Sequence, residues 1–203
     1  MLRAASGAGE RGRLPCRAQG APQPKFYWTR NNQHLNVNKT WKYNVELKQI
    51  DSLTYESTLL IEKVGSSDYG NYECIARNEL GQTKDSVRLD ITSKPELPLS
   101  LTVLNVSHDA ATVAWVPGFD GGEKASYRIR YREANSEHYK YEDSLPNTHK
   151  LTINGLKMNT LYLFSVMASN SLGSSNYLPD LTKAQTKGKL IFFYLNKISS
   201  YFN

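Results

Sequence analysis

The chain contains only two cysteines, Cys16 and Cys74, and the residues around them constrain its fold more than any other feature. Cys74 ends the run "SDYGNYEC", in which Tyr72 and Cys74 occupy alternate positions. Alternation with a period of two is typical of a β-strand, where every second side chain faces the same side of a sheet. Trp28 lies after Cys16 along the chain, within the short run "KFYWTR". Neither cysteine lies in a CxxC motif or beside a histidine at metal-ligand spacing, so the alternatives are a bonded pair and two free buried thiols in a cytosolic protein.

Turn signals and further alternating runs surround this strand. Asp68 suits a turn because its carboxylate can accept backbone N–H groups, and Gly70 allows the chain to turn sharply before the strand. Gly81 is expected in the turn of a following hairpin. The alternating apolar residues that we expect to face the core are Leu59, Ile61 and Val64 before the strand, and Val87, Leu89 and Ile91 after it.

The segments "LPCRAQGAPQPKFYW" and "DYGNYECIARNELG" together resemble an I-set immunoglobulin domain of the cell-adhesion type, over residues 10–92. The resemblance implies a disulfide between Cys16 and Cys74 across a β-sandwich, with Trp28 packed on it and Tyr72 as a tyrosine corner. Such a bridge would stabilise the fold by roughly 4 kcal/mol in the chain-entropy model. The first strand of such domains is not evident in this sequence. We therefore expect it to be missing or degraded and residues 1–9 to be disordered.

A second set of strands begins after a predicted linker at 93–98, which contains two prolines. Residues 99–187 contain no cysteine, a tryptophan in the run "TVAWV" (Trp115), and a Leu156, Thr160, Tyr162 turn pattern. These features resemble a fibronectin type III domain. The glycine-rich "WVPGFDGG" narrows the resemblance to receptors of the nephrin and Echinoid type. The predicted fold is all-β, with two β-sandwich domains in tandem.

The net charge of +6 does not indicate a nucleic-acid-binding face. The surplus of basic residues lies near the two ends of the sequence, and residues 95–187 carry equal numbers of basic and acidic side chains. The run "RIRYRE" alternates along a strand and is interpreted as a solvated face, with polyanion binding as the weaker alternative. No nucleic-acid partner is expected.

The sequence contains none of the common catalytic or nucleotide-binding motifs, and its four histidines are scattered. We therefore expect no enzyme activity, cofactor, metal or small-molecule substrate. Asn38 and Asn105 begin N-x-[ST] sequons, one in each half, and predict glycosylation in an extracellular setting. Neither a signal peptide nor a membrane-spanning helix is predicted, so membrane contact is expected only through parts of a parent protein outside this chain.

The combined resemblance implies a segment of a receptor ectodomain at the cell surface. Its expected partners are cell-surface proteins, either copies of itself or related immunoglobulin-superfamily receptors. Two alternatives remain, a structural spacer without a ligand and a segment of an intracellular array of such domains. The tail at 188–203 fits neither domain pattern, and its run "LIFFYL" has the composition of an aggregation-prone segment.

Overall fold

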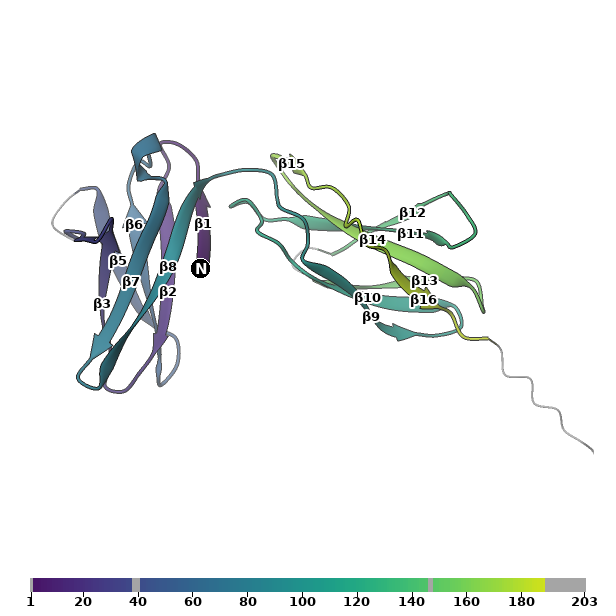
Figure 1. Cartoon of the computed structure of the whole chain (residues 1–203), viewed down its shortest axis with the longest axis horizontal. Coiled ribbons are helices and arrows are strands. Elements are labelled where there is room, and N and C mark those ends of the chain that lie inside the picture. Colours follow the sequence, from purple (N-terminus) through teal and green to yellow (C-terminus); the bar gives the residue numbers. More distant parts are fainter. Residues whose placement is uncertain (1, 38–40, 146–147, 189–203) are drawn as a thin grey trace, which may run out of the picture. The chain divides into compact units, whose positions relative to one another are not determined.

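The computed structural model describes residues 2–37, 41–145 and 148–188, and Figure 1 shows its strands. The regular elements are β-strands apart from η1, a three-residue 3₁₀ helix at Ser66–Asp68. The chain forms two compact units. The first contains the residues up to Leu97 together with 118–125 and 168–176, and the second contains most of the rest. The prediction of an all-β chain with two tandem sandwiches is confirmed.

The first sandwich consists of two sheets that face each other across a single core. One sheet has the strand order β1-β8-β7-β3-β4 and the other has the order β2-β6-β5. The strands are β1 (Leu2–Ser6), β2 (Gly12–Gln19), β3 (Lys25–Arg30), β4 (Gln33–His34), β5 (Tyr43–Gln49), β6 (Thr54–Ile61), β7 (Gly70–Asn78) and β8 (Gly81–Ile91).

Alternation along these strands decides which side chains reach the core. On β2 every second residue from Gly12 to Ala18 is buried, as the alternation of a half-buried strand requires. The expected inward positions before β7 are all buried. After β7, Val87 and Leu89 are buried, but Ile91 is 57% exposed. The expectation for Ile91 is therefore wrong: it is the last residue of β8, beyond the end of the packed core.

The N-terminal residues form a strand, which corrects two expectations. Leu2–Ser6 make up β1, which pairs in parallel with β8 from Leu2 opposite Val87 to Ser6 opposite Ile91. Residues 2–6 are thus ordered on a sheet edge, and the first strand is not missing. Alternation is weak here because β1 buries only Ser6 fully and packs Ala4 against the core. Its backbone pairs with β8 without a strong apolar pattern.

The second sandwich also has two sheets. They have the orders β13-β10-β9 and β12-β11-β14-β15, with β16 also paired to β14. The strands are β9 (Ser100–Val106), β10 (Ala110–Val116), β11 (Ser126–Glu133), β12 (Lys140–Asp143), β13 (Lys150–Asn154), β14 (Leu161–Asn170), β15 (Gly173–Ser174) and β16 (Thr182–Gln185). The core side chains include Val113, Trp115, Tyr127, Ile129, Tyr131, Ile153, Phe164 and Val166.

Residues in the predicted linker are hydrogen bonded to the glycine-rich loop. The Ser93 N–H donates to the Gly121 carbonyl at 3.0 Å, and the Glu96 N–H donates to the Phe119 carbonyl at 2.9 Å. Gly121 has a φ of +78°, and a Cβ there would lie 2.0 Å from the Ser93 carbonyl oxygen. The glycine is therefore required both by its left-handed backbone and by the close approach of another chain segment.

Candidate interaction surface

The two cysteines are joined by a disulfide, with an S–S distance of 2.07 Å and a Cα–Cα distance of 6.4 Å. Cys16 lies on β2 and Cys74 on β7, so the bond links the two sheets of the first sandwich. Trp28 is directly opposite Cys74 in the β3–β7 pairing and is buried in the same cluster. Its Nε1 donates to the Ser57 hydroxyl at 3.0 Å, which satisfies the indole N–H inside the core.

Tyr72 ties the turn before β7 to the strand itself. Its hydroxyl donates to the Asp68 carbonyl at 2.7 Å, and its ring is completely buried. Burial raises the pKa of the Tyr72 hydroxyl well above its usual range, so this group stays protonated and remains a donor. Gly70 adopts a φ of +128°, which a residue with a side chain rarely does. The geometry is that of a tyrosine corner.

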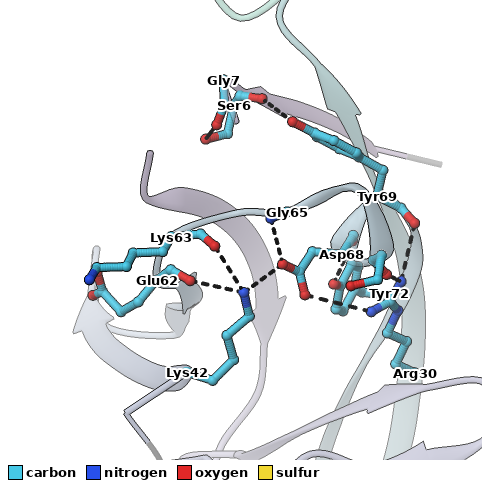
Figure 2. A network of polar contacts seen from close by, with 11 residues as sticks. Ser6, Gly7, Arg30, Lys42, Glu62, Lys63, Gly65, Asp68, Tyr69 and Tyr72 are labelled. Atoms are coloured by element: carbon cyan, nitrogen blue, oxygen red, sulfur yellow. Dashed lines mark hydrogen bonds and ion pairs between the residues drawn. The ribbon is translucent and has the colours of Figure 1, made fainter. Parts of the chain in front are cut away.

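The Asp68 carboxylate is buried and lies at the centre of a polar network, as Figure 2 shows. It accepts the Gly65 N–H at 2.8 Å and the Lys42 ammonium at 2.5 Å. The Lys42 Nζ also donates to the Glu62 and Lys63 carbonyls, at 3.0 and 3.1 Å. An ammonium has three N–H donors, so all three are occupied.

Arg30 completes this network on the β3 side. Its guanidinium donates to the Ser67 carbonyl and to the Tyr69 carbonyl, and it lies 4.9 Å from the centre of the Tyr72 ring. Sequence reasoning did not identify Arg30 or Lys42. No local pattern marks either residue, because each meets Asp68 only through the packing of strands distant in sequence. With its partners engaged in backbone bonds, Asp68 has a structural role and not the geometry of a catalytic acid.

The structural residues expected in the second half lie in its core. Leu156 is buried and its N–H donates to the Asp109 carbonyl at 2.8 Å. The Tyr162 hydroxyl accepts the Lys157 N–H at 2.9 Å and is buried. Trp115 is also buried, 5.3 Å from the Tyr127 ring, and its Nε1 finds no hydrogen-bond partner among the residues that the structure describes.

The arginines of "RIRYRE" are held by neighbouring side chains and carbonyls. Arg128 donates to both oxygens of Asp143, at 2.6 and 2.8 Å. Arg130 lies between the rings of Tyr139 and Tyr177, 4.6 and 4.2 Å from their centres. Arg132 donates to three carbonyls along its own turn. The arginines alternate with the buried Ile129 and Tyr131, as an outward face requires, and their stacking and ion pairing leave little for a polyanion to bind.

The N-terminal arginines, which contribute to the basic surplus near the ends of the sequence, also lie on a folded face. Three of them sit on or next to β2, and each is paired with a glutamate across the β2–β6–β5 sheet. The pairs are Arg11–Glu62 at 2.7 Å, Arg13–Glu46 at 2.7 Å and Arg17–Glu56 at 2.6 Å. Their charge is balanced locally, so this face is not a basic patch.

An apolar groove lies between the start of β3 and strand β5 of the first sandwich. It has a volume of about 540 Å³ and is lined by Pro24, Phe26, Tyr27 and Leu47 together with the polar Gln23 and Lys25. Tyr27 is 42% exposed and Leu47 is 51% exposed. Exposed apolar side chains gathered around a hollow are typical of protein-binding surfaces.

The apolar side chains of strand β5 differ in burial along the strand. Tyr43 and Val45 are partly buried and pack against the core, as the inward-facing alternative for this strand requires. Leu47 faces the same side but extends beyond the packed core. Of the three apolar residues of β5, only Leu47 is therefore placed to contact a partner.

The remaining predicted features are placed as follows. Asn105 is exposed on β9, where an attached glycan would meet solvent. Asn38 and residues 189–203 of the off-pattern tail lie outside the described residues. Within the described ranges, no helix is long and apolar enough to cross a membrane, and no group of three His, Cys, Asp or Glu side chains is placed to hold a metal ion.

Comparisons with known proteins agree with the two-sandwich architecture. Mouse nephrin is 37% identical over 164 residues, covering 80% of this chain and 13% of nephrin. Human nephrin is 33% identical over the same length, and the human cell adhesion molecule DSCAM is 31% identical over 180 residues, covering 87% of this chain and 8% of DSCAM. The chain thus spans about an eighth of nephrin's length, and less of DSCAM's.

Two domain families match the chain in succession. The immunoglobulin I-set domain matches residues 3–91 and the fibronectin type III domain matches residues 93–182. Both are non-catalytic in adhesion receptors. The chain therefore belongs to the immunoglobulin superfamily, as an I-set domain followed by a fibronectin type III domain, with nephrin and DSCAM among its homologues.

Proposed function

We propose that this chain is a recognition segment of a cell-adhesion receptor ectodomain and that it binds other cell-surface proteins through its immunoglobulin half. The observation that carries the proposal is the apolar groove beside Tyr27 and Leu47. A tyrosine and a leucine that remain largely exposed at a hollow can act as anchors for a partner. One relative is itself named a cell adhesion molecule.

The chemistry of the described residues favours binding over catalysis. The most buried carboxylate, Asp68, is fully engaged in holding the turn before β7. No converging set of acid, base and nucleophile accompanies the groove, whose polar members are Gln23 and Lys25. We therefore infer that the chain has no enzymatic activity or small-molecule substrate of its own.

An extracellular setting fits the same proposal. The Cys16–Cys74 disulfide links the two sheets, and such bonds persist in oxidising compartments. Asn105 is accessible for glycosylation on β9. We infer the same modification at Asn38 from its sequon alone.

The test is multivalent display of the whole chain on beads against a panel of cell-surface ectodomains, with copies of the chain included. We expect binding that falls at least about tenfold when Tyr27 and Leu47 are both replaced by serine, because anchors of this kind each contribute about 1 kcal/mol or more. The matched control is Tyr141→Ser, which removes a similarly exposed tyrosine from the fibronectin half.

Two results would contradict the proposal. A folded chain that binds no ectodomain in the panel would favour the spacer alternative. Binding that is lost with Tyr141→Ser and kept without Tyr27 and Leu47 would move the site to the fibronectin half.

A further inference from the structure

Strand β5 offers an open edge with a defined backbone orientation. Among the described residues it is the last strand of the β2-β6-β5 sheet, and no described strand pairs with its other edge. The Lys42 carbonyl just before it accepts the Glu62 N–H at 3.0 Å, so the even-numbered residues direct their backbone groups toward β6. By the alternation of an antiparallel ladder, odd-numbered residues such as Leu47 and Gln49 direct theirs to the open edge.

We propose that this edge pairs antiparallel with the same edge of a second copy of the chain, about a two-fold axis at Leu47. The proposal rests on the proposed recognition function and names its partner as the chain itself. In this register Leu47 of one copy lies opposite Leu47 of the other, and Glu46 lies opposite Lys48 twice, once on each side of the axis. A two-fold interface of this kind uses one self-complementary patch.

Charge selects this register over its neighbours. A shift that moves the axis to Glu46 places two glutamates opposite each other, and a shift to Lys48 places two lysines opposite each other. With the axis at Leu47, each Glu46–Lys48 pair occupies a non-hydrogen-bonded position, where opposite side chains approach most closely. Opposite charges at such positions stabilise the pairing, and like charges weaken it.

The side chains involved are available for this pairing. Lys48 is exposed and forms no ion pair with any residue in the part of the chain that the structure describes. Glu46 is exposed and pairs with Arg13, whose ion pair is itself exposed and therefore weak. The Glu46 carboxylate can thus accept a second cation.

The apolar side of the strand gains cover in the same arrangement. Leu47 lines the groove with Phe26 and Pro24. Leu47 of a second copy would lie beside it at the groove and remove apolar surface of both copies from water. In this register Gln49 lies opposite Val45 of the other copy. The Val45 N–H is already bonded to the Asn44 side chain at 2.8 Å, so the pairing depends on the central backbone bonds between the two Leu47 residues and on the charge pairs.

The expected association is weak, because one short edge buries little surface. We expect a dissociation constant between about 10 µM and 1 mM for the free chain. Many copies displayed on one surface would raise the effective affinity without any new contact.

The test is a charge swap between two variants of the whole chain, measured by sedimentation equilibrium. Lys48→Glu alone places Glu46 opposite a glutamate, and Glu46→Lys alone places Lys48 opposite a lysine. Each variant should self-associate at least about tenfold more weakly than the wild type, because both symmetric pairs become repulsive. An equimolar mixture of the two variants should recover the association, since each pair is then again of opposite charge.

Three further measurements accompany the swap. Lys183→Glu reverses an exposed charge on β16 and should leave self-association unchanged. Circular dichroism of each variant verifies that it is folded. Leu47→Asn, introduced into the wild type or into both charge variants, should weaken the association of the wild type and of the variant mixture alike.

A wild-type chain that stays monomeric at about 1 mM would overturn the inference. So would self-association that both charge reversals leave unchanged, or a variant mixture that fails to recover it. In any of these cases the proposed recognition function still stands if the beads bind a different ectodomain, which separates the two failures.

Discussion

At the scale of single residues, a buried charge network that includes Arg30 stabilises the immunoglobulin half. Asp68 is the carboxylate at its centre, and the Lys42 ammonium reaches it together with two backbone carbonyls. Removing one member of a buried pair leaves the other charge without compensation, which costs much more than the pair itself contributes. One of the residues that hold the turn before β7 is therefore a lysine 26 positions away from the aspartate in the sequence.

We expect Lys42→Met to lower the free energy of unfolding of the immunoglobulin half by about 2–4 kcal/mol, because Asp68 would stay buried with only the more distant Arg30 guanidinium, 4.0 Å away, to balance its charge. Denaturant unfolding of the whole chain, followed by circular dichroism, measures this. The matched control is Arg17→Met, which removes an exposed partner of Glu56 and should change stability by less than about 1 kcal/mol. Equal effects of the two changes would contradict the assignment.

The hydrogen bond of Tyr162 leads to a corresponding prediction for the fibronectin half. Tyr162→Phe removes the acceptor of the Lys157 N–H and should lower stability by about 1 kcal/mol or more. Tyr141→Phe is the control, since its hydroxyl lies on an exposed side chain. An unchanged unfolding midpoint for Tyr162→Phe would show that this hydroxyl does not hold the turn.

At the scale of elements, strand β1 changes what a functional fragment must contain. It adds a parallel strand to β8, and the Arg3 guanidinium donates from it to Asp90 at 2.9 and 3.1 Å. A chain shortened to begin at residue 10 would lose this strand and expose the edge of β8. The short N-terminal segment is thus part of the sheet and not an extension of it.

The pKa of the Asp90 carboxyl reports whether β1 is paired with β8. Burial by itself would raise the pKa of the Asp90 carboxyl, but hydrogen bonds from Arg88 and Arg3 outweigh burial and lower that pKa below its usual value. A carboxyl with a lowered pKa contributes stability above its unfolded pKa, and this contribution is lost as the pH falls through the folded pKa.

We therefore expect Arg3→Gln to raise the Asp90 pKa toward its usual value. The stability of the variant should then depend less on pH between the folded and the unfolded pKa of Asp90. Deletion of residues 1–7 should do the same and also lower the midpoint of thermal unfolding. Titration of the Asp90 carboxyl carbon by NMR measures the first effect. Lys84 lies on β8, as Asp90 does, but pairs with Glu73. The control Lys84→Gln should therefore leave the Asp90 pKa unchanged.

At the scale of the whole molecule, the chain consists of two sandwiches that each have their own core. Both cysteines belong to the immunoglobulin half, and the fibronectin half is packed by aromatic contacts such as Tyr131 on Phe164, with ring centres 6.1 Å apart. The covalent cross-link thus stabilises only the immunoglobulin half, which also has its own packed core, whereas the described part of the fibronectin half is held by non-covalent contacts.

Reduction of the disulfide should consequently separate two unfolding transitions. We expect a reductant to lower the stability of the immunoglobulin half by about 2–5 kcal/mol and to leave the fibronectin half unchanged. Calorimetry with and without reductant measures this, and alkylation followed by intact mass determination should find no free thiol before reduction. A single transition that shifts as a whole with reductant would contradict the division.

The sequence by itself determined the strands, because their evidence is local, and the two sandwiches followed from the resemblance of their motifs to two domain families. Alternating apolar residues, turn glycines and the Trp28 and Cys74 positions each act over a few neighbours, and a period of two is sufficient to assign a strand and its buried face. Tyr72 and Tyr162 could be identified for the same reason, since each binds a backbone group four or five residues away.

Only the tertiary structure decided which distant residues meet. Lys42 and Arg30 reach Asp68 across strands, and β1 pairs with a strand more than 80 positions later. The exposure of Leu47 likewise depends on where the opposite sheet ends, although it shares a face with Tyr43. Alternation fixes the side of a sheet on which a residue lies, but whether anything covers that side is set by packing between segments that the local pattern does not relate.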